Sequence, residues 1–96
     1  MFGLISKKKV IKAMAETLAH TQVNADYWYY INKDQKMSSF CLDESQALIE
    51  LLRKLHISRS VYDEAYKIYD FKNSGKKDFV PDLDNIKRVK SMIETD

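Results

Sequence analysis

Apolar side chains recur at three- and four-residue spacing from the start of the chain, which is the period of an amphipathic helix. Ser6 precedes this stripe and can accept a hydrogen bond from a free backbone N–H, so it is the expected N-cap. The stripe predicts one helix of about 25 residues, with a break near Asn24 as the alternative. Its apolar positions are Ile11, Met14, Leu18, Ala25 and Tyr29.

The segment from Tyr27 to Ile31 allows two interpretations. Aromatic and β-branched side chains favour strands, and residues 32–35 could reverse the chain to give a short hairpin over residues 27–42. The helical interpretation is the better one, because the apolar stripe of the preceding helix reaches this segment in phase.

A second helix is expected to begin after Asp43, a typical N-cap residue, with Gln46 at the capping-box position. It is expected to end near His56 and to turn its apolar stripe toward the core. The stripe consists of Leu48, Leu51, Leu52 and Leu55.

A third helix is expected to start at a cap formed by Ser58 or Ser60, to run to about Lys72, and to be closed by Gly75. Three tyrosines lie on one face of it. We expect their rings to form a wall of the core and their hydroxyls to reach water at the rim. These residues are Tyr62, Tyr66 and Tyr69.

A last helix opens at Pro81 or Asp82 and carries its own apolar stripe. The chain holds only 2 Gly and 1 Pro, and a scarcity of these turn-forming residues favours long helices. We therefore expect residues 1–96 to form a single all-α domain, a bundle of about four helices.

The totals narrow the function classes. A net charge of +2 and a pI near 8.6 are too small to indicate nucleic acid by themselves. The single cysteine, Cys41, cannot form an internal disulfide, which suits a reducing compartment. No apolar run approaches the roughly 20 residues that a membrane-spanning helix needs. We expect a cytoplasmic protein without a membrane partner.

No reactive constellation stands out in the sequence. The two histidines, His20 and His56, lie far apart and have no partner at metal-ligand spacing. Nothing around Cys41 resembles the surroundings of a catalytic nucleophile. We therefore expect no catalytic site, no metal and no cofactor, and a protein that is not an enzyme.

The segment from Leu51 to Lys67, LLRKLHISRSVYDEAYK, resembles the helix-turn-helix unit of bacterial DNA-binding regulators. Apolar residues occupy the positions through which the two helices of that unit pack. Two departures concern the packing: His56 stands where the family usually has Gly at the turn, and Leu52 where it has a small residue. The apolar positions are Leu51, Leu55, Ile57, Tyr62 and Ala65.

The resemblance implies DNA binding as an alternative function, that of a small transcriptional regulator. Against it, Asp63 and Glu64 lie where the recognition helix would approach DNA, and carboxylates repel phosphates. The candidate DNA-binding residues are Arg53, Lys54, Ser58, Arg59, Ser60 and Lys67.

Two surface features favour a protein partner instead. Four adjacent rings cannot all point inward on a regular element, so some of them should be exposed or covered by a partner or a second subunit. Lysines in the first turn of the first helix lie beside the partial positive charge of its macrodipole, which destabilises the helix. A destabilising feature without visible compensation indicates a function, here that of an electrostatic rim. The expected partner-binding residues are Tyr27, Trp28, Tyr29 and Tyr30, with Lys7, Lys8, Lys9 and Lys12.

The opening Met-Phe-Gly-Leu-Ile-Ser-Lys-Lys-Lys, the aromatic cluster and the Gln46-Ala47-Leu48 helix resemble small uncharacterised proteins of phages and mobile elements of Gram-positive bacteria. The resemblance implies a genetic setting. Within it we expect a non-enzymatic helical interaction protein, such as a stoichiometric inhibitor of a host defence protein. A homodimer is also expected, because so small a bundle has limited interior.

Overall fold

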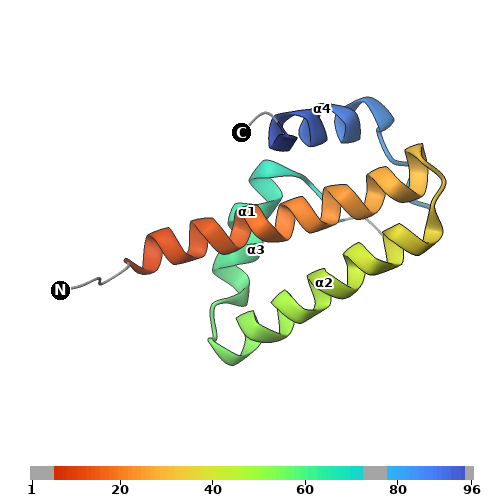
Figure 1. Ribbon diagram of the computed structural model, residues 1–96. Coiled ribbons are helices and arrows are strands. Elements are labelled where there is room, and N and C mark those ends of the chain that lie inside the picture. Colours follow the sequence, from red (N-terminus) through yellow and green to blue (C-terminus); the bar gives the residue numbers. More distant parts are fainter. Residues whose placement is uncertain (1–5, 73–77, 95–96) are drawn as a thin grey trace.

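The computed structural model describes residues 6–72 and 78–94, and these residues form helices and connecting segments without a strand. The elements are α1 (Lys7–Asp26), a π-helical segment η1 (Tyr27–Ile31), α2 (Gln35–Lys54), α3 (Ser58–Ile68) and α4 (Leu83–Glu94) (Figure 1). The predicted all-α bundle of four helices is confirmed. The alternative hairpin over residues 27–42 is wrong, because this segment is helical on both sides of a short turn.

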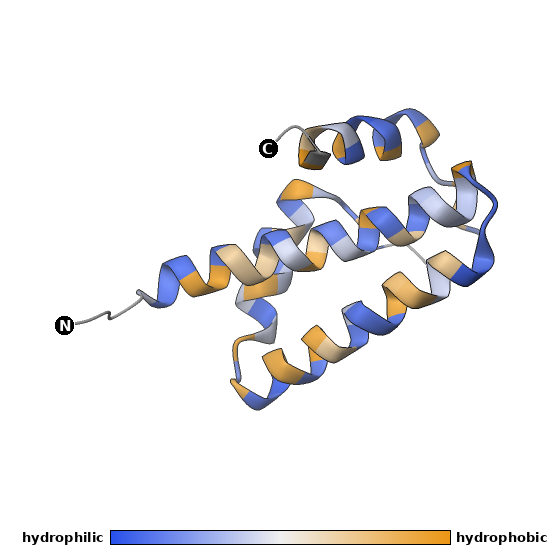
Figure 2. Cartoon of the chain, in the orientation of Figure 1, coloured by the Kyte–Doolittle hydropathy of each residue, from blue (hydrophilic) through white to orange (hydrophobic). Residues whose placement is uncertain are grey.

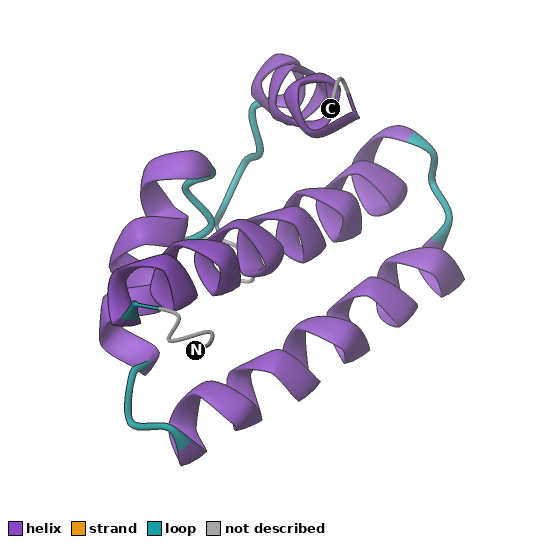
Figure 3. Cartoon of the chain, turned by 60° about the vertical axis from the view of Figure 1, so that its left-hand side comes forward, coloured by secondary structure: helices purple, strands orange, loops and turns teal. Residues whose placement is uncertain are grey.

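α1 is the central element of the bundle. The hydroxyl of Ser6 accepts from the backbone N–H of Lys9 (3.2 Å), so the predicted N-cap is confirmed. α1 and η1 together run from residue 7 to residue 31 without a break. α1 contacts each of the other three helices, with α2 and α4 on opposite sides of it (Figures 1 and 3). Its buried residues include Ala15, Leu18, Ala19 and Val23.

α2 begins earlier than the sequence suggested. Lys33 reverses the chain with a positive φ of 56°, and the side chain of Asp34 then accepts from the backbone N–H of Met37 (3.0 Å). The cap predicted at Asp43 is therefore wrong, and Asp43 lies exposed inside the helix. The first two turns of α2 are the segment that the hairpin interpretation had assigned to a strand.

The predicted core face of α2 is only partly correct. Leu52 is fully buried and Leu48 is partly buried, but Leu51 and Leu55 are exposed. Apolar side chains at three- and four-residue spacing can cover two neighbouring faces of a helix. Only one of these two faces of α2 contacts α1. Ser38, Cys41 and Ser45 occupy much of that contact instead.

α3 follows α2 after a tight turn in which His56 adopts a φ of 57°. Ser58 is its first residue, and the N-cap position is taken by Ile57, which has no side-chain cap. The helix ends at Ile68 and not near Lys72, because the backbone becomes extended at Tyr69. Gly75, the predicted closing residue, lies outside the described residues.

The three tyrosines do form a wall of the core, as predicted. Tyr62 and Tyr66 stack with a centroid separation of 5.9 Å and are partly buried. The prediction that their hydroxyls reach water is wrong for Tyr69, which is buried and donates a hydrogen bond to the carboxylate of Asp26. The extended backbone after α3 turns this ring inward toward the end of α1.

α4 starts as predicted. The side chain of Asp82 accepts from the backbone N–H of Asn85 (3.2 Å), and Ile86 and Val89 are buried against α1 and η1. Lys90 reaches the side-chain oxygen of Asn24 in α1 at 2.9 Å.

Side-chain hydrogen bonds to other elements concentrate on residues 22–26 of α1. Besides Asn24 and Asp26, Gln22 donates to the hydroxyl of Ser45 (2.7 Å), and the carbonyl oxygen of Ala25 accepts from the hydroxyl of Ser38 (2.9 Å). These bonds join one stretch of α1 to α2, to α4 and to the segment after α3. Within the described residues every buried side-chain polar atom has a partner.

Replacing Tyr69 by Phe removes the donor to a buried carboxylate and should lower the free energy of unfolding by about 1.5–3 kcal/mol at pH 7. Burial, followed by the hydrogen bond to Asp26, raises the pKa of Tyr69 above its ordinary value of 10.0. The stabilisation is therefore complete below pH 10.0 and is lost as the pH rises further, because the unfolded chain ionises first. Urea denaturation from pH 7 to 11, with Tyr29→Phe as the half-exposed control, measures both effects. A Tyr69→Phe variant as stable as the wild type contradicts the assignment.

His56 stands in a conformation that costs a residue with a Cβ roughly 1–2 kcal/mol. We expect His56→Gly to stabilise the fold by up to about 1 kcal/mol, since the gain is reduced by the greater freedom of glycine in the unfolded chain. Glu50→Gly, at an exposed position inside α2, should instead destabilise by about 1 kcal/mol. Thermal melts of the two variants give the comparison. A loss of stability in both would show that the imidazole of His56 makes a contribution of its own.

Candidate functional site

The four adjacent rings lie where α1 changes its hydrogen-bond register. The backbone N–H of Asn32 donates to the carbonyl of Tyr27 (3.1 Å), a five-residue separation that defines the π-helical turn η1. Such turns are rare and are found frequently at functional sites. The change of register distributes the rings around the end of α1.

The rings differ in their exposure. Tyr27 and Tyr30 pack against the core, Trp28 is partly buried, and Tyr29 is 49% exposed. Tyr27 meets Trp28 edge to face at 6.2 Å between centroids, and Tyr29 meets Tyr30 in the same way at 4.9 Å. No member of the cluster is fully buried, so the cluster is an aromatic edge of the core with Tyr29 as its outermost ring.

An open cavity of about 290 Å³ adjoins this edge and is lined by Tyr29, Tyr30, Lys33 and Gln35. Burial, then the nearby Asp26 carboxylate and then Tyr29, raise the pKa of Tyr30. Like any phenol with a pKa of 10.0 or above, Tyr30 is protonated at neutral pH and can donate a hydrogen bond. The cavity thus combines two phenol rings with an ammonium and an amide.

α4 covers one side of the aromatic cluster. The ammonium of Lys90 lies 4.8 Å from the centroid of the Tyr27 ring, within the range of a cation–π contact. This contact and the hydrogen bond to Asn24 hold α4 beside η1. Tyr27 is therefore less available to a partner than Trp28 or Tyr29.

The predicted lysine rim lies elsewhere. Lys7, Lys8 and Lys9 are exposed in the first turn of α1, and Lys12 follows one turn later. From Lys12 to the end of α1 at Asp26 the helix extends about 20 Å, at 1.5 Å per residue. The structure does not bring the lysines and the aromatic cluster together, so they are two separate surface features.

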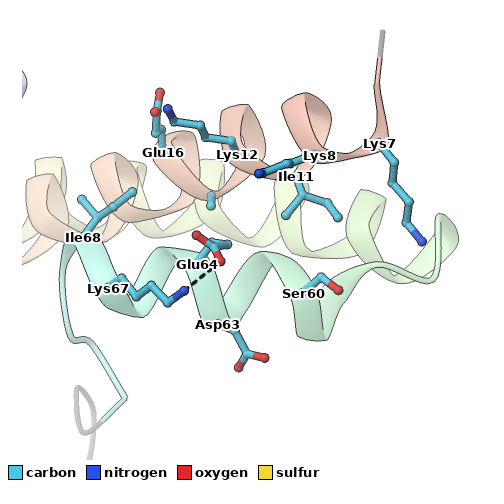
Figure 4. Close-up of a pocket in the computed structure, with 11 residues that line it drawn as sticks. Lys7, Lys8, Ile11, Lys12, Glu16, Ser60, Asp63, Glu64, Lys67 and Ile68 are labelled. Carbon is cyan, nitrogen blue, oxygen red and sulfur yellow. Dashed lines mark hydrogen bonds and ion pairs between the residues drawn. The ribbon is translucent and has the colours of Figure 1, made fainter.

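Three of these lysines, Lys7, Lys8 and Lys12, line a groove between α1 and α3, whereas Lys9 does not. A second open cavity, of about 770 Å³, lies between the first half of α1 and α3 (Figure 4). Ile11, Ala15 and Ile68 supply its apolar lining. Its charged and polar lining residues are Lys7, Lys8, Lys12 and Glu16 from α1, and Ser60, Asp63, Glu64 and Lys67 from α3.

The candidate DNA-binding residues surround the α2–α3 turn. Arg53, Lys54, Arg59 and Ser60 are exposed and Ser58 is partly buried, whereas Lys67 pairs with Glu64 at 3.0 Å. Leu51 and Leu55, which were expected to pack the two helices together, are exposed. α3 makes most of its helix contacts with α1, and its contact with α2 is small.

The described residues show neither a metal site nor a membrane-spanning helix. Across residues 6–72 and 78–94, no group of three or more His, Cys, Asp or Glu side chains could hold a metal ion. No helix of that same part of the chain has both the length and the apolar character needed to cross a membrane. Compared with protein-family models, curated proteins and solved structures, the chain shows no match.

Sequence reasoning missed one surface, which we call the α2 ridge. Its large side chains stand in solvent: Phe40 is 59% exposed, Leu55 49%, Leu51 45% and Met37 37%. The signal was available, because a single helix starting at Gln35 gives these residues a continuous three- and four-residue spacing. The α2 ridge consists of the exposed residues Met37, Phe40, Glu44, Ala47, Leu51 and Leu55, whereas Leu48 beside them is partly buried against the core.

Cys41 is a free thiol buried against α1. Burial first, and the Glu44 carboxylate second, raise the pKa of this thiol, while Lys90 lowers it. Because only the thiolate attacks disulfide reagents, we expect Cys41 of the folded protein to react at least about tenfold more slowly than in urea. Absorbance kinetics with an aromatic disulfide at pH 8 give both rates. Equal rates would mean that α2 opens freely from α1.

Proposed function

We propose that this chain is a non-enzymatic helical interaction module that binds a partner protein through the exposed part of the aromatic cluster. The observation that carries the proposal is the half-exposed ring of Tyr29 beside Trp28, at the rim of an open cavity. Tyrosine and tryptophan supply large rigid contact area at low entropic cost and dominate many protein interfaces. Tyr30 and Tyr27 support these rings from the core side.

The concrete form that we propose is a phage-encoded stoichiometric inhibitor of a host defence protein, acting in the cytoplasm. The genetic setting rests on the resemblance of the opening residues, the aromatic cluster and the Gln46–Leu48 helix. The free buried thiol of Cys41 suits a reducing compartment. An inhibitor that acts by occupying a surface needs no reactive group of its own.

The lysines contribute to this function as a second, separate feature. Their ammonium groups are exposed about 20 Å or more from the aromatic cluster along α1. At that distance they would accelerate encounter with an acidic partner more than they would stabilise the complex. We therefore assign affinity to Trp28 and Tyr29, and the rate of association to Lys7, Lys8 and Lys9.

A second candidate function is that of a DNA-binding regulator. It is favoured by the α2–α3 turn, where His56 takes the left-handed conformation that glycine adopts in the resembling family. The exposed carboxylates of Asp63 and Glu64 on α3 oppose it. This function requires binding to duplex DNA that weakens steeply with salt and depends on Arg59.

The test is capture from a lysate of a Gram-positive host by the immobilised chain, with and without nuclease. We expect the wild type to recover one host protein in stoichiometric amount, independently of nuclease. The double variant Trp28→Ala, Tyr29→Ala should lose at least about tenfold in capture, because truncating hot-spot rings costs more than 1 kcal/mol each.

Phe40→Ala is the matched control, since Phe40 is also an exposed aromatic residue but lies on α2. Its capture should equal that of the wild type, and all variants should keep the helical circular dichroism. Capture that disappears with nuclease, together with a salt-sensitive shift of duplex DNA lost on Arg59→Ala, supports the second candidate function. Equal capture by the double variant contradicts the assignment to the aromatic cluster.

A further inference from the structure

The face of α2 that meets α1 is built largely from small side chains. Ser38, Cys41 and Ser45 are buried there, and two of them are tied to α1 by the hydrogen bonds of their hydroxyls. Small side chains let two helices approach closely. Most of the large apolar side chains of α2 therefore stand outside this contact.

The α2 ridge is displaced around the helix from the contact with α1. With 3.6 residues per turn, the centre of the ridge lies about 100° from the centre of the buried face. In a four-helix bundle each helix packs against two neighbours on adjacent sides, at close to this angle. α2 therefore has the two faces of a bundle helix, and α1 covers one of them.

Nothing in the described part of the chain covers the second face. α2 contacts α1 and η1 along its length and α3 near its C-terminal end, while α4 lies on the far side of α1 (Figure 1). Hydrophobic residues recur along the whole of α2, which forms the outer edge of the molecule (Figure 2). Within residues 6–72 and 78–94, the ridge side chains are thus left exposed.

The ridge has a two-fold pattern about its own midpoint, between Ser45 and Gln46. Met37 and Leu55 are equally distant from this point, and so are Phe40 and Leu51, to within one residue. In an antiparallel pair of α2 helices, Phe40 would thus face Leu51 of the partner subunit, twice. Large side chains would then pack against large ones on both sides of the midpoint.

The two-fold pattern extends to the centre of the ridge. Glu44 would face Ala47 of the partner subunit, whose small side chain leaves the carboxylate a path to water. A parallel pair would instead place two Glu44 carboxylates and two Phe40 rings directly opposite each other. The order of residues therefore selects the antiparallel orientation.

We propose that the α2 ridge is a homodimer interface that binds the α2 ridge of a second copy in the antiparallel orientation. The two α1–α2 pairs then form an intermolecular four-helix bundle with an isologous interface. One helix face is smaller than a standard protein interface, so we expect a weak dimer that is in equilibrium with the monomer. The inference does not depend on the proposed function, since it concerns a different surface.

Charged residues beside the ridge predict the salt dependence. Lys36, Asp43, Glu50 and Lys54 lie along one flank in the order positive, negative, negative, positive. Across the antiparallel pair like charges come near each other, and salt screens this repulsion. The dimer should therefore become tighter as NaCl rises from about 0.05 to 0.5 M, whereas docking through opposite charges would weaken.

Sedimentation equilibrium of the full chain tests the proposal over about 1–500 μM, which brackets a dimer of modest area. We expect the mass to rise from the 11.3 kDa of the monomer toward twice that value. Ala47→Glu, at the exposed centre of the ridge, should weaken dimerisation at least about tenfold. Leu42→Glu is the matched control, because Leu42 is also an exposed apolar residue of α2 but lies off the ridge.

Chemical cross-linking tests the orientation independently of these variants. In a Cys41→Ser background, a short bifunctional thiol reagent should join a Phe40→Cys chain to a Leu51→Cys chain. It should join neither variant to itself. A chain that stays monomeric up to the highest concentration overturns the proposal, and so does efficient linkage of Phe40→Cys to its own copy.

Discussion

The fold depends on one buried carboxylate at the end of its central helix. Asp26 is the last residue of α1, inside the continuous helical run formed with η1, in a position shielded from water. A carboxylate in such a place is costly unless donors surround it, and the hydroxyl of Tyr69 is one of them. This bond spans 43 residues of sequence and fixes the extended segment after α3 against α1. The same carboxylate acts on Tyr30, whose pKa it helps to raise after burial.

Hydrogen bonds, and not only apolar contacts, decide how α1 pairs with its neighbours. Gln22 and the Ala25 carbonyl each meet a serine of α2, and Asn24 meets Lys90 of α4. The hydrophobic effect is non-directional, whereas a buried polar atom loses its specific partner when the register shifts. The small polar residues of α2 thus help to specify where the helix lies, and most of its large apolar residues lie outside this contact.

Much of the fold could be predicted from local chemistry. The caps at Ser6 and Asp82 and the apolar stripe of α1 from Ile11 to Ala25 can be recognised from nearby residues, and the structure agrees with them. The last member of the predicted stripe, Tyr29, is instead exposed, because the π-helical turn changes the phase of the helix before it. The start of α2 could not be predicted as easily, because Asp34 and Asp43 are equally good caps and only the contact with α1 distinguishes them. The bond from Tyr69 to Asp26 leaves no local signal, since it joins residues that are remote in sequence. The exposed apolar ridge was missed because its helix was expected to begin after Asp43, whereas it begins at Gln35.

The π-helical turn has a consequence for how this chain tolerates change. A π-turn closes each ring over one residue more than an α-turn does. Deleting any one residue between Tyr27 and Ile31 would let the segment return to the α-helical register, so the backbone could absorb the loss locally. The residues that follow would keep their direction, so the turn at Lys33 and the serine contacts of α2 on α1 could persist. The same deletion inside the regular part of α1 would rotate everything after it by about 100° around the axis. The π-turn is therefore the place where this long helix can lose a residue, at the cost of rearranging only its own rings.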